Sequence, residues 1–337
     1  MEQITLPEGY TSLLSIYETQ KAIGLLKRLF EDALSGSLHL HRVSAPLFVA
    51  ASSGLNDDLN GVERPVAFDI NGVHDTAQVV HSLAKWKRLA LKRYHFHPGE
   101  GLYTDMNAIR RDEDLDNLHS AYVDQWDWEK IITAEDRNID FLKQTVQQIV
   151  DSLSNTQRFL HSVFPQLSIL PKLGNQVTFI TSQELENLYP NLSSKDRENA
   201  FVKNHPVTFL IGIGGQLTSG KPHDSRAPDY DDWNLNGDLL VWDSIGARAM
   251  ELSSMGIRVN PESLDRQLTI AGCDNRRELP FHKMLLNNEL PLTIGGGIGQ
   301  SRVSMLLLGK AHIGEVQSSL WSDEIISHCE ENGVILL

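Results

Sequence analysis

The chain has 337 residues, 41% hydrophobic and 22% charged, which is typical of a globular protein with a sizeable core. Its net charge of −14 argues against a protein that mainly grips nucleic acid, because phosphate-backbone binding relies on clustered lysine and arginine. Two cysteines, a start unlike a signal peptide and no apolar stretch of membrane-spanning length together predict a cytoplasmic protein that does not enter membranes.

The first third of the chain is expected to hold a long helix, short strands and a basic helix. Residues 17–34 carry apolar side chains at helical spacing. A strand over residues 38–46 ends at Pro46, which cannot donate to a ladder. A hairpin follows over residues 66–80, and residues 81–93 form a basic helix. A solvated face is the ordinary explanation of such a charge cluster, and an anion site is the alternative.

The most informative stretch covers residues 99–129 and predicts one long β-hairpin. Both arms are rich in strand formers, and the polar residues 111–117 between them are typical of an exposed loop. Arg110 arrives at the end of the first arm, where a guanidinium can hold a phosphate bidentately. A polar face that is merely hydrated is the alternative.

Alternation along the second arm of this hairpin separates two faces. The face expected to join the core carries Tyr122, Trp126 and Trp128. The opposite face carries Val123, Gln125 and Asp127. The hairpin therefore predicts an amide and a carboxylate side by side on the exposed surface of a sheet.

The middle of the chain predicts a helix over residues 139–164 and strands over 177–181 and 207–214. Residues 215–221 fit the first seven positions of a phosphate-binding P-loop, but Pro222 stands where serine or threonine should hold magnesium. Since no helical pattern follows, this segment is interpreted as a turn between strands.

Two adjacent strands are expected to carry carboxylates. Asp238 lies on the strand over residues 235–243, and Glu251 on its antiparallel neighbour over 249–259. If the two carboxylates face each other, a cation must lie between them, and magnesium held together with a nucleotide is the usual arrangement. Glu251 and Arg258 are seven residues apart, so both can reach one site only if a bulge near residues 253–256 shifts the register.

The last informative stretch, residues 293–302, is a glycine-rich strand that leads into an apolar helix carrying Arg302. Its glycines permit a ligand or a backbone to approach closely, and a buried arginine would need a partner. The spacing lacks the last glycine of a dinucleotide fingerprint, so a Rossmann site is rejected. A plain turn with a surface arginine is the alternative.

Pro46, Arg110 and Arg302 together resemble the three motifs of class II aminoacyl-tRNA synthetases. The residues in these motifs are more similar still to those of the ammonia-dependent asparagine synthetases. The chain resembles this family over nearly its whole length. The stretches that carry this resemblance are residues 81–88, 99–129, 226–233, 251–259 and 295–302.

The resemblance implies an α+β fold, with an antiparallel sheet flanked by helices in a single domain over residues 1–337. It implies a homodimer with the Pro46 strand near the interface. The implied reaction is the ATP-dependent conversion of L-aspartate and ammonia into L-asparagine, AMP and pyrophosphate through a β-aspartyl-adenylate. ATP and Mg²⁺ are the implied cofactors, and neither a nucleic acid nor a membrane is an expected partner.

The resemblance also implies roles for individual residues. Arg110 would hold the α-phosphate, Arg302 would contact ATP, and Ser120 matches a position near the nucleotide. Asp238 and Glu251 would stand near magnesium and the phosphates. The positions that match those around aspartate and the amide-forming centre are Asp57, Lys87, Gln125, Asp127, Asp231, Ser254 and Arg258.

Some assignments stay open at this level. Asp57 fits the family's loop better than Asp58, although a slip of one residue is an alternative. Asp57, Asp127 and Asp231 are the candidates to bind ammonium or accept its protons, and Arg258 is a candidate for the substrate's carboxylate. The link between Trp233 and Asn236 is unusually short for the family, which leaves any lid over the site in doubt.

Free ammonia is the expected nitrogen source on independent grounds. A glutamine-using synthetase of the N-terminal-nucleophile type needs a cysteine at its mature N-terminus, but Glu2 follows Met1 here, and Cys273 and Cys329 lie far away. The alternatives to the ligase are an aspartyl- or asparaginyl-tRNA synthetase-like paralogue and a regulatory dimer that only senses aspartate or an adenylate.

Overall fold

A computed structural model describes residues 4–57 and 63–337, and within them a large mixed sheet of eight strands forms the centre of the molecule. The strand order is β1-β5-β6-β11-β10-β9-β8-β7. Their bounds are β1 Leu40–Arg42, β5 Gly101–Ile109, β6 Tyr122–Ile131, β7 Thr178–Thr181, β8 Val207–Ile211, β9 Asp231–Asp243, β10 Arg248–Arg258 and β11 Thr293–Gly299. The predicted long hairpin is the β5–β6 pair.

The expected antiparallel sheet is correct for the inner strands and wrong at both edges. β1 pairs in parallel with β5, and β7 in parallel with β8. Parallel neighbours need a crossover connection, and the chain supplies one through helices in each case. The central pairs, from β5 across to β8, are antiparallel as predicted.

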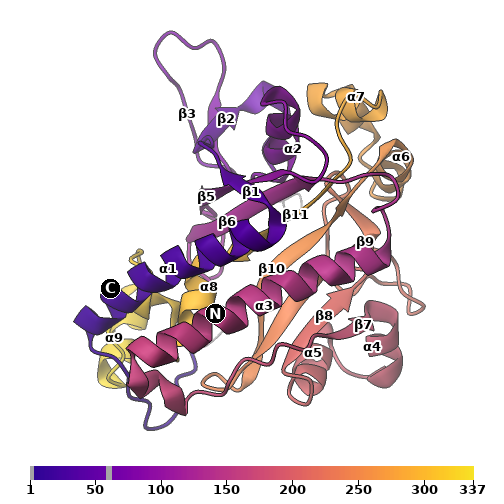
Figure 1. Ribbon diagram of the computed structural model, residues 1–337. Helices are drawn as coiled ribbons and strands as arrows, with labels where there is room; N and C mark the ends of the chain where they lie inside the picture. The colour runs from indigo at the N-terminus through magenta and orange to yellow at the C-terminus, as the bar shows by residue number, and fades with distance from the viewer. Residues whose placement is uncertain (1–3, 58–62) are drawn as a thin grey trace.

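A second, three-stranded sheet of order β2-β4-β3 comprises β2 Phe48–Ala50, β3 Ala67–Phe68 and β4 Ala77–Val79. The antiparallel pairing of β3 with β4 confirms the predicted hairpin over residues 66–80. The small sheet stands beside one edge of the large sheet, next to α2 (Ala84–Arg93), as Figure 1 shows.

Two long helices, α1 (Ile16–Leu38) and α3 (Ile139–Val163), lie side by side across one face of the large sheet (Figure 1). Ser15 and Glu18 form a capping box at the start of α1, which begins and ends close to the predicted bounds. The ring of Phe30 packs 4.6 Å from that of Trp126, between the centroids, in the main core. The face of the sheet that α1 and α3 cover is therefore the apolar one.

The remaining helices cap the ends of the large sheet (Figure 1). They are α4 Ser182–Leu188, α5 Ser194–Val202, α6 Pro261–Ile270, α7 Pro280–Leu286, α8 Gln300–Leu308 and α9 Asp323–Glu331, with short 3₁₀ turns at Ala51–Ser53, Pro165–Ile169, Asp274–Glu278 and Ile313–Glu315. Among the described residues, no helix combines the length and the apolar character needed to span a bilayer.

Trp126 and Trp128 are completely buried, as the alternation along the hairpin predicts. Tyr122, which was assigned to the same buried face, is only partly buried, and its hydroxyl donates to Asn107 at 2.5 Å. It stands at the first residue of β6 and lines a cavity there. Gln125 and Asp127 point to the opposite face, which leaves that side of the sheet available for a polar site.

Candidate active site

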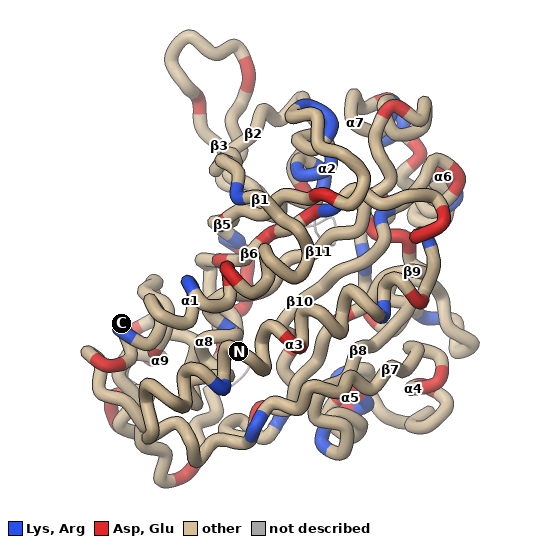
Figure 2. The backbone as a smooth tube through the Cα atoms, viewed as in Figure 1, with Lys and Arg blue, Asp and Glu red and all other residues tan. Residues whose placement is uncertain are grey.

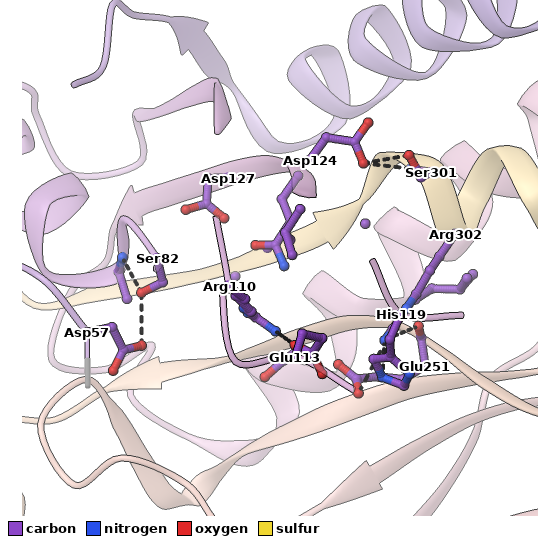
Figure 3. A pocket seen from close by; sticks show the side chains of 18 of the residues that line it. Asp57, Ser82, Arg110, Glu113, His119, Asp124, Asp127, Glu251, Ser301 and Arg302 are labelled. Atoms are coloured by element: carbon purple, nitrogen blue, oxygen red, sulfur yellow. Dashed lines mark hydrogen bonds and ion pairs between the residues drawn. The ribbon is translucent and has the colours of Figure 1, made fainter. Parts of the chain in front are cut away.

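A cavity of about 450 Å³ opens on the face of the sheet opposite α1 and α3. It is lined by the β5–β6 loop, by β6, β10 and β11, by the N-terminus of α8 and by the loop that precedes β9. All but one of the predicted site residues line it: Asp57, Lys87, Arg110, Ser120, Gln125, Asp127, Asp231, Glu251, Ser254, Arg258 and Arg302. Figure 3 shows several of these side chains converging on one space.

The glycines of β11 make room for this constellation. A Cβ atom at Gly295 would lie 2.0 Å from Oε2 of Glu129 and 2.7 Å from Nη2 of Arg258. A Cβ atom at Gly297 would lie 2.3 Å from Oε1 of Gln125. The expectation was a close ligand or backbone, whereas side chains of the neighbouring strands approach these two glycines. A backbone approaches at Gly296, where a Cβ atom would lie 2.9 Å from the carbonyl oxygen of Ser254.

The floor of the cavity is a buried ion network centred on Arg258. Its Nε donates to Glu129 at 3.0 Å, its Nη2 donates to the same carboxylate at 2.8 Å, and its Nη1 pairs with Asp231. Burial would raise the pKa of Glu129, but Arg258 and Lys87 hold it below its usual value. Glu129, which sequence reasoning did not single out, therefore remains ionised and fixes the guanidinium.

Lys87 belongs to the basic helix α2, on which Figure 2 shows the basic residues gathered. A solvated face was the ordinary expectation, and it is wrong for the inner side of this helix, where Lys85, Lys87 and Arg88 are buried. Nζ of Lys87 donates to the carbonyl of Gly296 at 2.9 Å and lies 3.4 Å from Oδ2 of Asp127. Burial lowers the pKa of Lys87, although the carboxylates of Asp127 and Glu129 raise it.

A second buried cluster holds the loop that leads into β9, whose first residue is Asp231. Asp229 accepts from Arg276 at 2.8 Å and pairs with His282 at 2.9 Å, and Lys85 lies 3.6 Å away. Lys85 shares helix α2 with Lys87, so the cluster ties this helix to the loop before β9. Sequence reasoning missed it because its members are far apart in the chain.

Two arginines line the side of the cavity toward the β5–β6 loop. Arg110 follows β5 directly, and its Nη1 lies 3.7 Å from a carboxylate oxygen of Glu113. Arg302 lies in the first turn of α8. Its Nη1 donates to the carbonyl of Glu251 at 3.0 Å and lies 3.7 Å from that residue's carboxylate. Figure 3 shows Arg110 and Arg302 entering the cavity from different elements. Two guanidiniums in this setting can bind an oligophosphate.

Asp238 is the predicted site residue that does not line the cavity. The expectation that it lies directly opposite Glu251 in the strand pair is wrong. Asp238 is paired with Ser254 in the ladder, whereas Glu251 is opposite Leu240. The cation next to Asp238 is Arg226, whose Nη2 lies 2.6 Å from the carboxylate. Burial, together with Glu251, raises the pKa of Asp238 to about 6 although Arg226 lowers it.

The expected irregularity in β10 is present, as two register shifts at the two ends of the predicted range, residues 253–256. The register shifts between Glu251 and Ser253 and again between Gly256 and Arg258. Met255 and Ile257 consequently stay in the main core, while Glu251, Ser254 and Arg258 all face the cavity. One bulged strand thus contributes Glu251 beside Arg302 and Arg258 in the floor of the cavity.

Asp57 and Ser120 line the cavity as buried residues, each with 3% of its surface exposed. The hydroxyl of Ser82 donates to Asp57 at 2.9 Å, an interaction visible in Figure 3, and Ser120 donates to Ser319 at 2.8 Å. Asp58, the alternative to Asp57, lies outside the described residues. Residues 233–236, the unusually short link, lie inside β9, which runs without interruption across them.

The comparison with known sequences decides the family. Residues 17–333 match the family described as aspartate-ammonia ligase. The chain belongs to the aspartate–ammonia ligase family. A ligase from Clostridium perfringens is 60% identical over the full length of both chains, and one from Clostridium tetani is 56% identical over 100% of this chain and 98% of its own length. These matches confirm the family that the motifs predict and the ligase class of enzyme it implies.

Solved structures similar to this family member confirm the fold class. An asparaginyl-tRNA synthetase of Entamoeba histolytica in complex with asparaginyl-adenylate superposes with a TM-score of 0.67 at 14% identity, over 90% of this chain and 66% of its own. The corresponding enzyme of Pyrococcus horikoshii, complexed with asparaginyl-adenylate, gives 0.67 at 13% identity, over 90% of this chain and 70% of its own. This chain therefore spans about two thirds of the length of those synthetases and shares their catalytic fold.

Several cavity residues of this ligase family member escaped the sequence reasoning. They are Glu63, Ser82, Glu113, His119, Asp124, Asp224, Arg226, Tyr230, Ser301 and Gln317. The sequence could have identified some of them as site residues. Arg226 and Tyr230 stand in a stretch that carries the family resemblance, and His119 immediately precedes Ser120. The sequence did not identify Asp124 as a cavity residue, because alternation places it on the buried face with Trp126. Asp124 accepts a hydrogen bond from the hydroxyl of Ser301 at 2.7 Å.

Proposed function

We propose that this chain catalyses the ATP-dependent amidation of L-aspartate by ammonia, through a β-aspartyl-adenylate, and releases L-asparagine, AMP and pyrophosphate. The observation that carries the proposal is the division of one cavity into two sides. Arg110 and Arg302 line it toward the β5–β6 loop, and the acids Asp57, Asp127 and Asp231 line it beside buried Lys87 and Arg258. Such a cavity suits a nucleotide placed next to an amino acid.

In the first step, the β-carboxylate of aspartate attacks the α-phosphorus of ATP, and pyrophosphate leaves. Negative charge grows on the phosphate oxygens, so Arg110 would stabilise the transition state and Arg302 would hold the nucleotide. Lys87, Ser254 and Arg258 would hold aspartate. Gln125 points into the same space beside Gly297 and would orient the reacting carboxyl group.

In the second step, ammonia attacks the activated carbonyl and AMP leaves. The nitrogen must lose protons, so a carboxylate is required nearby. Asp57, Asp127 and Asp231 remain the candidates. Asp231 already pairs with Arg258, and Oδ2 of Asp127 lies 3.4 Å from Lys87. These cavity carboxylates would also raise the local concentration of ammonium.

The donor set fits magnesium bound together with a nucleotide. Glu251 presents a carboxylate to the cavity with 35% of its side chain exposed, and Asp238 lies behind it on the neighbouring strand. Magnesium usually takes one or two carboxylates and completes its shell with substrate phosphates and water. When bound, the ion would neutralise charge on the phosphate oxygens. No cluster of three or more metal-ligating side chains occurs among residues 4–57 and 63–337, which fits a site completed by phosphates.

Incubation with aspartate, ATP and ammonium tests the proposal. Free asparagine and stoichiometric AMP are expected. Aspartyl- or asparaginyl-tRNA formed on added tRNA would instead favour the synthetase-like alternative. Binding of aspartate or an adenylate with no release of pyrophosphate would favour the regulatory dimer.

We further propose a homodimer in the cytoplasm. β1 forms an edge of the large sheet, and two exposed apolar side chains follow it closely in the chain, Leu47 at 51% and Phe48 at 40% exposed. Both cysteines are free thiols, which suits a reducing compartment. Analytical ultracentrifugation tests the dimer: a species of twice the chain mass supports it, and a monomer at micromolar concentration contradicts it.

A further inference from the structure

Arg226 is a cation in the cavity wall to which the sequence assigns no role. Its Nη2 lies 2.6 Å from Oδ1 of Asp238, and its Nη1 donates to the hydroxyl of Ser254. Only 11% of the side chain is exposed. The guanidinium therefore bridges β9 and β10 at the surface of the cavity.

The backbone around Arg226 is shaped to hold its side chain in place. Gly214 has a φ of +100°, and a Cβ atom there would lie 2.8 Å from Cβ of Arg226 and 2.7 Å from the ring of Trp233. The space that glycine leaves is thus filled by the stem of Arg226 and by the indole. A guanidinium fixed in this way before any ligand arrives is preorganised to stabilise charge.

Arg226 also has N–H groups that are not used in hydrogen bonds within the described part of the chain. A guanidinium carries five N–H groups, and Nε of Arg226 has no hydrogen-bond partner in the described part of the chain although it is buried. Arg258, the other guanidinium near Ser254, engages Glu129 with two nitrogens and Asp231 with the third, and its side chain is only 3% exposed. Arg226 is therefore the more available of the two for an anionic ligand.

The position of Arg226 coincides with the junction of the two substrates. Ser254 is expected beside aspartate, and Asp238 beside the phosphates. We propose that Arg226 is a further catalytic residue, which contacts the reacting β-carboxyl group of aspartate and stabilises the negative charge that forms there. This inference rests on the proposed function and adds a reaction-centre role that neither the motifs nor the resemblance assigns.

The charge that Arg226 would stabilise follows from the chemistry. The lone pair of ammonia forms the C–N bond, and the carbonyl π electrons move to oxygen. Collapse of this oxyanion reforms the carbonyl and breaks the bond between carbon and the phosphate oxygen, and AMP leaves with that electron pair. The one surplus proton on nitrogen passes to a cavity carboxylate, and Arg226 keeps its own protons throughout.

The competing explanation is that Arg226 serves only as the counterion of Asp238. Three charged groups act on the Asp238 carboxylate. They are Arg226 from the loop before β9, Glu251 from β10 and Glu198 from α5. Removal of Arg226 would leave Asp238 harder to ionise, and more alkaline solution would correct this defect. A contact with the reacting carboxyl group would be lost at every pH.

The test compares R226Q with the wild-type enzyme between about pH 7 and pH 9. Asparagine formation gives kcat and the KM of each substrate, and calorimetry gives the affinity for aspartate. The expected result is a fall in kcat of about 100-fold or more that is the same at each pH. A deficit that disappears at the alkaline end, or an unchanged kcat, would overturn the inference.

R226K provides a second measurement if R226Q does not fold. It keeps a positive charge beside Asp238 but lacks the planar fork. The inference expects kcat to fall at least about 10-fold, with aspartate affinity nearly unchanged, whereas full activity would establish the counterion role. R197Q is the matched control, because Arg197 is 10% exposed and pairs with Glu186 outside the cavity. A wild-type chain that forms no asparagine would count against the proposed function itself.

Discussion

Nη2 of Arg302 lies 2.9 Å from Nε2 of His119, and the other ring nitrogen of His119 lies 2.9 Å from Asp116. A guanidinium can only donate, so Nε2 accepts and the ring proton lies on Nδ1, toward the carboxylate. Burial would raise the pKa of Asp116, but His119 lowers it to about 2. Asp116 is therefore ionised at neutral pH and fixes both the tautomer and the orientation of the ring that holds Arg302.

Replacement of His119 by alanine removes one anchor of Arg302. We expect the KM of ATP to rise about 10-fold, because one charged hydrogen bond is lost, with a smaller change in kcat. Steady-state kinetics measures both values. His74→Ala, at an exposed position far from the cavity, is the control. An unchanged KM of ATP in the His119 variant would show that Arg302 needs no support from the ring.

Arg110→Ala separates catalysis from folding. Arg110 makes one long ion pair, at 3.7 Å to Glu113, and its side chain is 26% exposed. The free energy of unfolding should change by less than about 1 kcal/mol. Turnover should fall by about 100-fold or more, since a transition-state contact is lost. The neighbouring exposed Arg111 supplies the control variant Arg111→Ala, which should retain normal turnover.

Equal turnover of the Arg110 and Arg111 variants would mean that the hairpin has been misinterpreted. Chemical denaturation of the two variants, followed by tryptophan fluorescence, checks that neither change acts through the fold. A large loss of stability in Arg110→Ala alone would likewise count against a purely catalytic role.

Gly295→Ala should disrupt the floor of the cavity. The new methyl group would start 2.0 Å from Glu129, whose carboxylate holds Arg258, so the pair must separate or the strands must move apart. We expect a loss of stability of about 1–3 kcal/mol and a large rise in the KM of aspartate. Thermal and chemical unfolding measure the first effect, and kinetics the second.

The matched control is Gly299→Ala in the same strand. The nearest atom to a Cβ there would be Cβ of Arg302 at 3.5 Å, an ordinary contact. This variant should keep most of its stability. If the two variants were equally stable, the space left at Gly295 would not be what holds Glu129 in place.

Asp238 should titrate within the physiological range. Burial raises its pKa to about 6, above the value expected in the unfolded chain. The stability that this group contributes is therefore fully present at a pH below its unfolded pKa, and it is lost as the pH rises through about 6. Carbon-13 NMR of aspartate-labelled protein should show one carboxyl resonance titrating near this value.

The resonance should disappear in Asp238→Asn, and that variant should also lose the corresponding decline in unfolding free energy on going from acid to neutral pH. A wild-type spectrum in which every aspartate titrates below its ordinary value would contradict the prediction. Neither measurement depends on turnover, so both remain informative if the substitution abolishes activity.

Local sequence patterns were sufficient to predict the two faces of the central hairpin, the irregularity in β10 and the close packing at β11. Alternation along residues 122–128 separates the buried Trp126 and Trp128 from Gln125 and Asp127, because a strand has only two faces. The seven-residue spacing of Glu251 and Arg258 predicts a bulge, and the glycine-rich strand predicts a close approach. The single domain over residues 1–337 and the individual catalytic roles remain predictions.

Only the tertiary structure decided which groups meet across the sheet. The register of β9 against β10 places Asp238 opposite Ser254 and brings Arg226, from a separate loop, onto the carboxylate. Crossovers make the edge strands parallel, and the packing of α2 buries Lys85 beside Asp229. Periodicity tells which way a side chain points, but the partner it meets depends on register, bulges and chain crossings, which are set by the packing of segments far apart in sequence.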